Sequence, residues 1–331
     1  MKNRVLISAA ITCALGSQPG PTIAAPLQKD KLQIEFQTLT RGFDGRVGIC
    51  AQDETGLACV NGDQRFSLQS VMKLLVGLAV MDAVDQRGWR LDEEIVVRKE
   101  DLSLYVQPIA ELVKDQGYRT TVGDLVRRAI VDSDSAAADI LVRRLGGPKE
   151  VQSSLDRRAI SGVRFDRDER HLQTEILGLE WRSEFVDPAI LESAIAGAPQ
   201  ERRDTSYRQY QIDPRDTATP RAMASLLYAL ANGKLLSPTS TTYLLEMMSK
   251  TVTFPDRLRA GVSKGWKLGH KTGTSSTWEG VTAATNDVGI LTAPDGHKIS
   301  IVVFVGDSHE APFKRAAITA SAARLTISHY Q

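Results

Sequence analysis

The chain has 331 residues, 42% of them hydrophobic, and its 41 Lys and Arg nearly balance 40 Asp and Glu. This length suffices for about two domain-sized bodies with a buried core, and the ordinary glycine and proline content excludes collagen-like and low-complexity chains. Nucleic-acid binders carry a basic excess or stripe, so the balanced charge predicts no nucleic-acid partner.

The first 24 residues have the layout of a secretory signal peptide. Lys2 and Arg4 precede an apolar run over residues 5–15, and small residues follow at 22–25. The run is shorter than the roughly 20 apolar residues that span a bilayer. We therefore predict cleavage near Ala24, no stable membrane anchor, and an exported protein that is periplasmic or secreted.

Two cysteines, Cys50 and Cys59, remain after that cleavage and flank a turn signal at residues 53–56. Apolar runs on both sides of the turn predict a β-hairpin in which the two side chains can face each other. An oxidising compartment favours a disulfide at this spacing. The alternative is two free thiols packed as small apolar groups, because ladder geometry does not suit every bridge.

Helical signals dominate the middle of the chain, and strand signals return near its end. Helices are expected over residues 27–41, 70–84, 122–131, 135–144, 148–158, 221–231 and 311–327, and strands over 266–270, 281–291 and 299–305. Strands at both ends around a helical middle predict an α+β fold, with one antiparallel sheet built from both chain ends and an inserted all-helical subdomain. The sheet subdomain is assigned to residues 25–68 and 217–331, and the helical one to residues 69–216.

Residues 174–215 interrupt this compact pattern. The segment is too long and too polar for an ordinary connection. Segments of this kind are commonly functional lids or excursions from the body of the protein.

Ser70 and Lys73 lie inside the apolar helix predicted at residues 70–84. Positions i and i+3 share a helix face, so the hydroxyl and the amine are neighbours. Desolvation favours a neutral amine, which can take the proton of a serine and make it a nucleophile. The alternative is a lysine that snorkels to the surface, because the Ser-x-x-Lys pattern is common by chance.

Two further clusters carry polar chemistry. Ser133-Asp134-Ser135 lies at a predicted helix start, where a hydroxyl can serve as a cap and nothing more. Lys271-Thr272-Gly273-Thr274 follows a predicted strand, and there the glycine permits close backbone approach while the lysine suits an anionic group. Each cluster is ordinary by itself. The combination is more specific than any single cluster, because the three sets of residues lie in this order on a helix, a helix start and a late strand.

The motifs Ser70-x-x-Lys73, Ser133-Asp134-Ser135 and Lys271-Thr272-Gly273 resemble those of class A serine β-lactamases and penicillin-binding proteins. The resemblance covers nearly all of the mature chain. Residues 164–173 also resemble the Ω-loop that carries the deacylating glutamate of class A enzymes, which penicillin-binding proteins lack. The resemblance implies a β-lactamase-like fold and a hydrolase that opens cyclic amides.

This resemblance assigns the catalytic roles. Ser70 becomes the acylated nucleophile, with Lys73 and Glu169 as alternative proton acceptors for acylation. Glu169 activates the water that hydrolyses the acyl-enzyme. Ser133 relays a proton to the leaving lactam nitrogen.

The resemblance also implies a β-lactam antibiotic as the small-molecule substrate. Its carboxylate would meet Lys271 and Thr272, and the backbone N–H groups of Ser70 and Thr274 would form the oxyanion hole. Tyr105 matches an aromatic residue that flanks the family's cleft. A plain packing or surface tyrosine is the alternative.

Three charged residues match supporting positions of the family. Arg257 matches an arginine that assists carboxylate binding in some members, although a solvated surface arginine is an equal alternative. Arg167 and Asp216 match the ion pair that braces the neck of the Ω-loop. With this pair in place, we expect Glu169 to keep its position while the insertion between Gln173 and Asp216 bulges outward, so that residues 164–216 form an extended Ω-loop region beside the cleft.

Two residues depart from the family pattern. Ser135 stands where the motif usually has asparagine, and a hydroxyl cannot offer both an amide donor and a carbonyl acceptor. Gln173 stands where an asparagine usually helps to hold the deacylating water, and its extra methylene displaces the amide. We expect penicillins still to acylate the enzyme, with an altered rate or substrate profile that includes slow deacylation.

The five histidines show no His-x-x-x-His spacing and the cysteines no Cys-x-x-Cys spacing, so neither a metal nor another cofactor is implied. We expect a monomeric serine β-lactamase. Two alternatives stay open: a slow penicillin-binding hydrolase or peptidase that acts on cell-wall peptides, and a non-catalytic β-lactam-binding sensor. A binder gains nothing from a deacylating base, so Glu169 favours the hydrolase.

Overall fold

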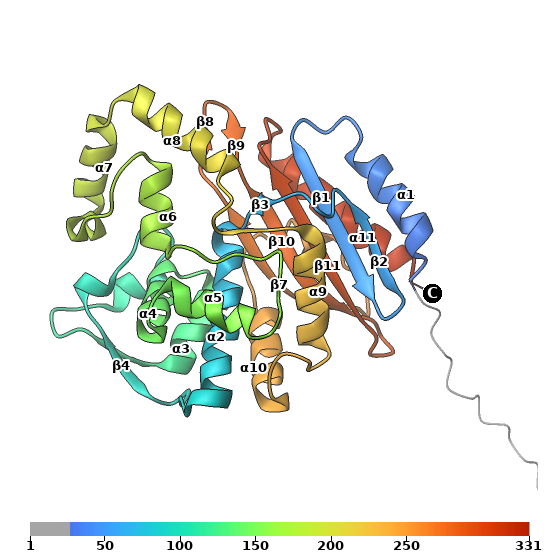
Figure 1. Cartoon of the computed structure of the whole chain (residues 1–331), viewed down its shortest axis with the longest axis horizontal. Helices are drawn as coiled ribbons and strands as arrows, with labels where there is room; N and C mark the ends of the chain where they lie inside the picture. The colour runs from blue at the N-terminus through green and yellow to red at the C-terminus, as the bar shows by residue number, and fades with distance from the viewer. Residues whose placement is uncertain (1–26, 331) are drawn as a thin grey trace, which may run out of the picture.

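The computed structural model describes residues 27–330. A five-stranded antiparallel sheet, together with the helices that cover it, forms one half of the described part of the molecule (Figure 1). In the order of the sheet, the strands are β2 (Gly56–Val60), β1 (Arg46–Asp53), β11 (Lys298–Gly306), β10 (Thr285–Thr292) and β7 (Lys267–Thr274). β1 pairs with β11, so the two ends of the chain close one sheet, as predicted. The proposed signal peptide lies outside the described residues.

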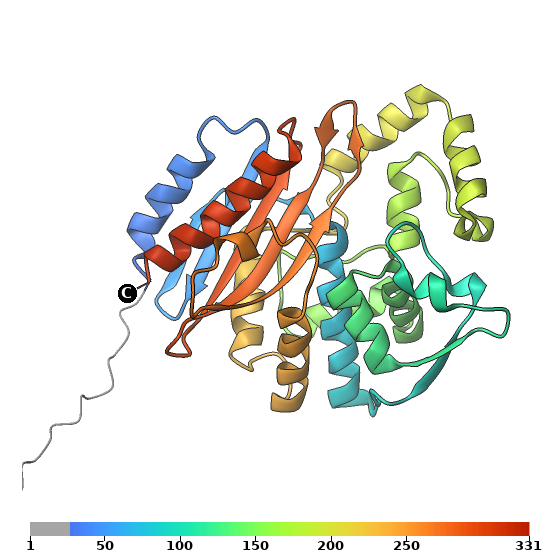
Figure 2. The same ribbon diagram turned by 180° about the vertical axis from the view of Figure 1, so that it is seen from behind.

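Helices cover both faces of this sheet. Ile301 and Val303 of β11 pack in one core with α1 (Lys29–Thr40) and α11 (Pro312–Ser328), which lie side by side over the sheet in Figure 2. Val302 and Phe304 belong to the core on the opposite face, where α9 (Pro220–Ala231) packs. Because side chains alternate along a strand, a strand covered on both faces is apolar at every position. This burial explains the continuous apolar run at residues 301–305.

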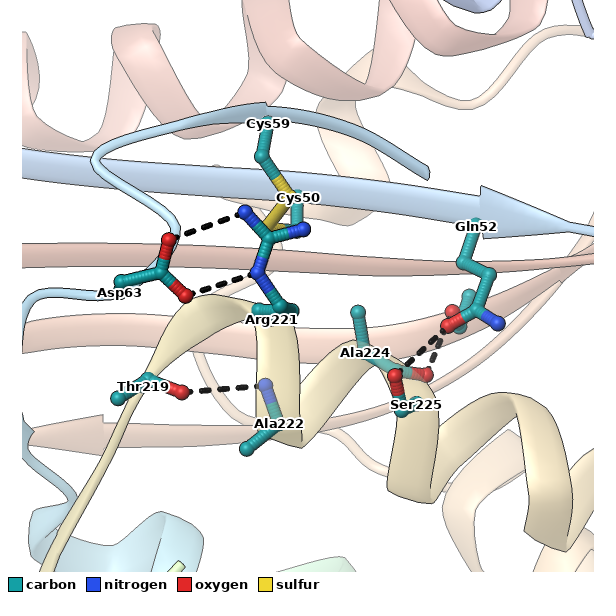
Figure 3. Close-up of a disulfide and its surroundings, with 10 residues drawn as sticks. Cys50, Gln52, Cys59, Asp63, Thr219, Arg221, Ala222, Ala224 and Ser225 are labelled. Atoms are coloured by element: carbon teal, nitrogen blue, oxygen red, sulfur yellow. Dashed lines mark hydrogen bonds and ion pairs between the residues drawn. A yellow bond between two sulfur atoms is a disulfide. The ribbon is translucent and has the colours of Figure 1, made fainter. Parts of the chain in front are cut away.

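The predicted disulfide is present at the β1–β2 edge of the sheet. Cys50 and Cys59 are directly paired in the ladder, and their sulfur atoms are 2.02 Å apart (Figure 3). Gly62 packs against the bridge so closely that a Cβ there would lie 3.2 Å from Cys59 Sγ. Beside the bridge, Arg221 of α9 forms a 2.8 Å ion pair with Asp63. The bridge therefore lies where the hairpin meets α9, and the alternative of two free thiols is wrong.

The helical half is built around α2 (Met72–Arg87), which lies between the sheet and the other helices (Figure 1). The helices α4 (Ser135–Leu145), α5 (Pro148–Asp156) and α10 (Pro238–Ser249) contact it directly, together with a π-helical turn (Arg128–Asp132). This turn ends α3 (Val122–Arg127), so the helix expected over residues 122–131 is shorter than predicted. Among residues 27–330, no helix is both long and apolar enough to cross a membrane.

Short elements complete the chain. They are β3 (Phe66–Ser67), β4 (Glu94–Val97), β5 (Tyr118–Thr121), β6 (Thr217–Ala218), β8 (Thr277–Trp278) and β9 (Val281–Thr282), with 3₁₀ turns at Gln69–Val71, Lys99–Asp101, Pro108–Leu112, Ser183–Val186 and Leu258–Gly261. The single strand expected over residues 281–291 is wrong. β9 pairs with β8 in a separate hairpin, so the long strand β10 begins only at Thr285.

The segment expected as an enlarged loop is helical instead. It contains the end of α6 (Glu169–Ile176), then α7 (Pro188–Gly197) and α8 (Gln200–Ile212). In Figure 1, α7 forms the outer edge of the molecule and α8 runs back to the β8–β9 hairpin. Tyr207 and Tyr210, three positions apart, are buried on one side of α8. Two aromatic residues give this polar helix an inner face, which explains why a mostly polar sequence folds here.

Two carboxylates anchor the segment that carries Glu169. Asp216 accepts hydrogen bonds from Arg167 Nε at 2.7 Å and from the Arg167 N–H at 3.0 Å, so the expected ion pair at the neck forms. Asp139 of α4 accepts from the N–H of Glu169 at 2.8 Å and from the N–H of Arg170 at 3.2 Å. Together these contacts fix the backbone at the start of α6.

The Asp139 anchor is sensitive to pH. Burial, followed by the negative charges of Asp168 and Glu169, raises the pKa of Asp139 to about 7. An aspartate in an unfolded chain titrates near pH 4. Between about pH 4 and about pH 7 the folded protein therefore binds the extra proton, and this group makes folding less favourable as the pH rises.

We predict that Asp139→Asn removes this pH dependence. The variant should gain unfolding free energy relative to the wild type as the pH rises from about 4 to about 7, by up to about 4 kcal/mol. Urea unfolding of both proteins across this pH range measures the difference.

Asp82→Asn is the matched control, because Asp82 is also buried but has the opposite shift. Burial raises the pKa of Asp82, but hydrogen bonds from Arg158 and Arg157 outweigh this effect and lower the pKa to about 2. Its difference from the wild type should be constant from about pH 4.5 upward. A constant difference for Asp139→Asn as well contradicts the prediction.

Candidate active site

Lys73 of α2 has no exposed surface, and four oxygen atoms surround its ammonium group. Nζ donates to Ser70 Oγ at 3.1 Å, to the Ser133 carbonyl at 2.6 Å and to Ser135 Oγ at 3.1 Å. Glu169 Oε1 lies 3.2 Å from the same nitrogen. Burial of an unpaired charge is strongly unfavourable. A lysine is therefore tolerated at this position only because these oxygen atoms pair with it. The alternative of a lysine that snorkels to the surface is wrong.

Ser70 lies in the 3₁₀ turn that leads into α2, and this turn is held against the sheet. A Cβ on Gly273 of β7 would come within 2.5 Å of the Leu68 carbonyl and 3.1 Å of the Ser70 nitrogen, so only glycine permits this close approach. Asn286 of β10 donates from Nδ2 to the same Leu68 carbonyl at 3.1 Å. The serine is thereby fixed between the helical half and the sheet.

Ser133 is placed by the π-helical turn and has a left-handed φ of 60°. The cap of α4 is the neighbouring Asp134, whose carboxylate accepts from the Ala137 N–H at 2.9 Å. The Ser133 hydroxyl instead accepts from Lys271 Nζ at 2.9 Å, so its interpretation as a helix cap is wrong. Burial, reinforced by the charge of Lys73, lowers the pKa of Lys271 well below its usual range.

The Glu169 carboxylate lies between Lys73 and Gln173. Its Oε2 accepts from Gln173 Nε2 at 3.2 Å, and Glu169 is only 1% exposed. The same Gln173 amide donates to Gln69 Oε1 at 3.0 Å. The longer side chain of Gln173 thus keeps a contact with the glutamate and gains one with the residue before Ser70.

A cleft of about 220 Å³ opens onto these side chains. It is lined by Gln69, Ser70, Tyr105, Val106, Ser135, Glu169, Gln173, Thr274, Ser275 and Ser276. Tyr105 is 55% exposed, which places it at the cleft surface and not in the core.

Arg257 is 4% exposed, so the alternative of a solvated surface arginine is wrong. It donates to Thr274 Oγ1 at 2.7 Å, and burial lowers its pKa to about 10. Thr272 is also buried and shares a 2.6 Å hydrogen bond with Thr253 Oγ1. Of these residues, Thr274 lines the cleft. A substrate anion there would meet the Thr274 hydroxyl with the Arg257 cation directly behind it.

One group in the described part of the chain has the composition of a metal site, away from this cleft. Asp53, Glu54 and His297 bring ligand atoms within 4.8 Å of one another. The Asp53 carboxylate already accepts hydrogen bonds from the N–H groups of Leu27 and Thr55, and His297 lies 2.6 Å from Glu54. Protein contacts account for these side chains without an ion.

Four residues that contact the motifs were not identified from the sequence: Gln69, Asp139, Tyr210 and Asn286. Gln69 had a visible signal, because it is a polar residue directly before Ser70. The others reach the site from distant segments, and only the folded chain brings them there. The Cys50–Cys59 bridge contributes no residue to the cleft lining.

Known proteins of one family are similar to this chain. A sequence model of the β-lactamase enzyme family matches residues 31–330. β-Lactamase VEB-1 of Pseudomonas aeruginosa is 29% identical, with 92% of this chain and 91% of that protein covered. The extended-spectrum β-lactamase PER-1 of the same organism is 28% identical, with 91% and 86% covered.

Solved structures agree with the sequence comparisons. An ancestral class A β-lactamase, GNCA, has a TM-score of 0.70 and 32% identity over 90% of this chain and 99% of its own. A β-lactamase from Chitinophaga pinensis DSM 2588 has a TM-score of 0.73 and 28% identity over 89% and 97%. The chain therefore belongs to the β-lactamase enzyme family, among the class A serine β-lactamases.

Proposed function

We propose that this β-lactamase opens its substrate through an acyl-enzyme on Ser70, which a water activated by Glu169 then hydrolyses. One observation carries the proposal: Lys73 Nζ lies 3.1 Å from Ser70 Oγ and 3.2 Å from Glu169 Oε1. Lys73 is thus one hydrogen bond from the nucleophile and Glu169 one ion pair further, so both candidate bases lie in the distance range in which proton transfer operates.

In the acylation step, Ser70 Oγ bonds to the lactam carbonyl carbon while its proton passes to the neutral amine form of Lys73, or Lys73 in its ammonium form hands a proton to Glu169 as it takes that of Ser70. Ser133 gives its proton to the lactam nitrogen as the C–N bond breaks and takes a replacement from Lys271. The 2.9 Å hydrogen bond from Lys271 Nζ to the Ser133 hydroxyl supports this relay. Backbone N–H groups of Ser70 and Thr274 are the proposed donors to the oxyanion.

In the deacylation step, Glu169 takes a proton from the water that attacks the ester carbonyl. The contact from Gln173 to Glu169 Oε2 supports this role, because it fixes the plane of the carboxylate beside Ser70. Glu169 also favours the proposed hydrolase over a β-lactam sensor. A sensor must keep its adduct, whereas a buried carboxylate next to the ester promotes its loss.

The substrate profile is proposed to be atypical because of Ser135. Its hydroxyl keeps a contact with Lys73 at 3.1 Å, so the arrangement around the lysine survives without an amide. What a serine lacks is the amide N–H₂ that can reach the acylamino side chain of a penicillin or a cephalosporin. We expect this substrate group to be recognised weakly.

Replacement of Glu169 tests the mechanism. Glu169→Gln should accumulate protein heavier by the full mass of benzylpenicillin, with turnover lower by about a hundredfold or more, because acylation continues without the deacylating base. Quenched intact-mass spectrometry measures the adduct. The double variant Ser70→Ala/Glu169→Gln is the control and should stay unmodified. Unchanged turnover in Glu169→Gln excludes the proposed role of the glutamate.

Replacement of Ser135 tests the substrate profile. Ser135→Asn should raise kcat/KM for benzylpenicillin by about fivefold, because one hydrogen bond to the acylamino group is worth on the order of 1 kcal/mol. 6-Aminopenicillanic acid lacks that acyl group and serves as the matched substrate, with kcat/KM expected to change little. An equal gain for both compounds would point to an effect on Lys73 and not on side-chain recognition.

We also propose that residues 1–24 direct export, because their layout is that of a signal peptide and because the Cys50–Cys59 bridge suits an oxidising compartment. The protein recovered outside the cytoplasm should begin near Ala25. Its mass should fall below that of the reduced chain by two hydrogen atoms. Recovery of the protein only in the cytoplasm, with its first residues intact, contradicts this proposal.

A further inference from the structure

The helix α8 reaches the catalytic centre through one side chain. Tyr210 is 5% exposed, and its hydroxyl lies 2.6 Å from Ser67 Oγ. Gln69 Nε2 donates to the same hydroxyl. Gln69 Oε1 accepts from Gln173, and Gln173 donates to Glu169. A continuous series of hydrogen bonds thus connects the insertion with the proposed general base.

The direction of the amide hydrogen bonds in this series follows from the charge of Glu169. A carboxylate only accepts, so the Gln173 amide must present N–H₂ to it, and the same N–H₂ group donates to Gln69 Oε1. The Gln69 N–H₂ must then point to Tyr210, whose hydroxyl accepts there and shares a second hydrogen bond with Ser67. Burial raises the pKa of Tyr210, so the phenol keeps its proton.

The middle of α8 is fixed independently. The Tyr207 hydroxyl donates to backbone carbonyls of the β8–β9 hairpin, at 2.8 Å to Ser276 and 3.0 Å to Val281. Trp278 of the hairpin donates from Nε1 to Asp204 at 2.7 Å. The Tyr207 and Tyr210 rings pack edge to face with centroids 6.1 Å apart. Tyr210 therefore approaches Gln69 from a helix with a rigid support.

We propose that Tyr210 is a positioning residue for deacylation, which acts through Gln69 and Gln173 to hold the Glu169 carboxylate. This inference rests on the proposed acyl-enzyme mechanism and extends it. Without the phenol oxygen, the buried Gln69 N–H₂ loses its acceptor, and rotation of the amide to find another removes the acceptor of Gln173. The insertion thereby sets the rate at which the ester is hydrolysed.

The contacts of Ser70 explain why the two catalytic steps should respond differently. Ser70 Oγ receives its hydrogen bond from Lys73, and Lys73 contacts neither Tyr210 nor Gln69 among its hydrogen-bond partners. With Lys73 as the base for acylation, loss of the Tyr210 hydroxyl should therefore spare this step. In a two-step mechanism kcat/KM reports acylation alone, whereas slower deacylation lowers kcat and KM together.

The test is Tyr210→Phe with benzylpenicillin. We expect the acyl-enzyme to decay about tenfold to a hundredfold more slowly, because a buried polar group loses its partner. The kcat and KM values should fall together, and kcat/KM should stay within about twofold of the wild type. Decay of the adduct is followed by quenched intact-mass spectrometry after removal of unbound penicillin.

Tyr243→Phe is the matched control, since Tyr243 is a partly buried tyrosine whose hydroxyl donates at 2.9 Å to the Gly123 carbonyl, outside the cleft. It should leave kcat and KM unchanged. If Tyr210→Phe does not fold, Gln69→Met breaks the same series at the next residue, and the same fall in adduct decay is expected. Where both variants fold, their effects should not add, because they interrupt one path.

The outcomes separate this inference from the proposed function. An adduct that decays at the wild-type rate in Tyr210→Phe, or a fall in kcat/KM with normal decay, overturns the role of Tyr210. Glu169→Gln is measured in the same series. If neither that variant nor Tyr210→Phe forms an adduct, the acyl-enzyme mechanism fails and the inference fails with it.

Discussion

The ammonium group of Lys73 is fully buried, and much of the helical half is arranged so that oxygen atoms pair with it. Its four oxygen neighbours come from three segments: Ser70 at the start of α2, the Ser133–Ser135 turn, and Glu169 of α6. Removal of one partner from a buried ion pair costs about 3 to 5 kcal/mol. The three segments must therefore assemble together, and the assembly that compensates the lysine also places a nucleophile beside two bases.

The position of Glu169 creates a second electrostatic problem. Asp139 and Asp168 lie close to it, and their charges oppose one another, as the raised pKa of Asp139 records. Arg170 compensates for part of this repulsion, since its Nε lies 3.7 Å from Asp139 Oδ2. Carboxylates gathered around a catalytic base reduce stability. Such a trade between stability and activity is common at active sites.

The sequence predicts the parts of this site that depend on local spacing. Ser70 and Lys73 follow from an i, i+3 pair in an apolar helix, and the two-ended sheet follows from strand patterns at residues 46–60 and 266–305. Local spacing cannot show which of two adjacent residues makes a contact. The sequence thus allows Ser133 as a helix cap, whereas in the structure Asp134 is the residue that caps α4. The sequence also does not predict the burial of Arg257, because its partners lie on strands that are distant in the sequence.

The insertion shows the limit of sequence reasoning most clearly. Its composition suggested a polar loop, yet Tyr207 and Tyr210 fold α8 against the cleft. Gln69 and Tyr210 are 141 positions apart, so their contact has no local signature. The resemblance to an Ω-loop ends at Gln173, so it predicts nothing for the rest of this segment. Only the tertiary structure shows that Tyr210 contacts Gln69, the residue before Ser70.

The central claim is that Ser70, Lys73 and Glu169 form one unit that makes and then hydrolyses an ester. A crystal structure of Glu169→Gln after exposure to benzylpenicillin tests it most directly. We expect a covalent bond from Ser70 Oγ to the opened lactam carbonyl, with the carbonyl oxygen between the N–H groups of Ser70 and Thr274 and the carboxylate beside the Thr274 hydroxyl. Unmodified Ser70, or an adduct on any other residue, would contradict the account.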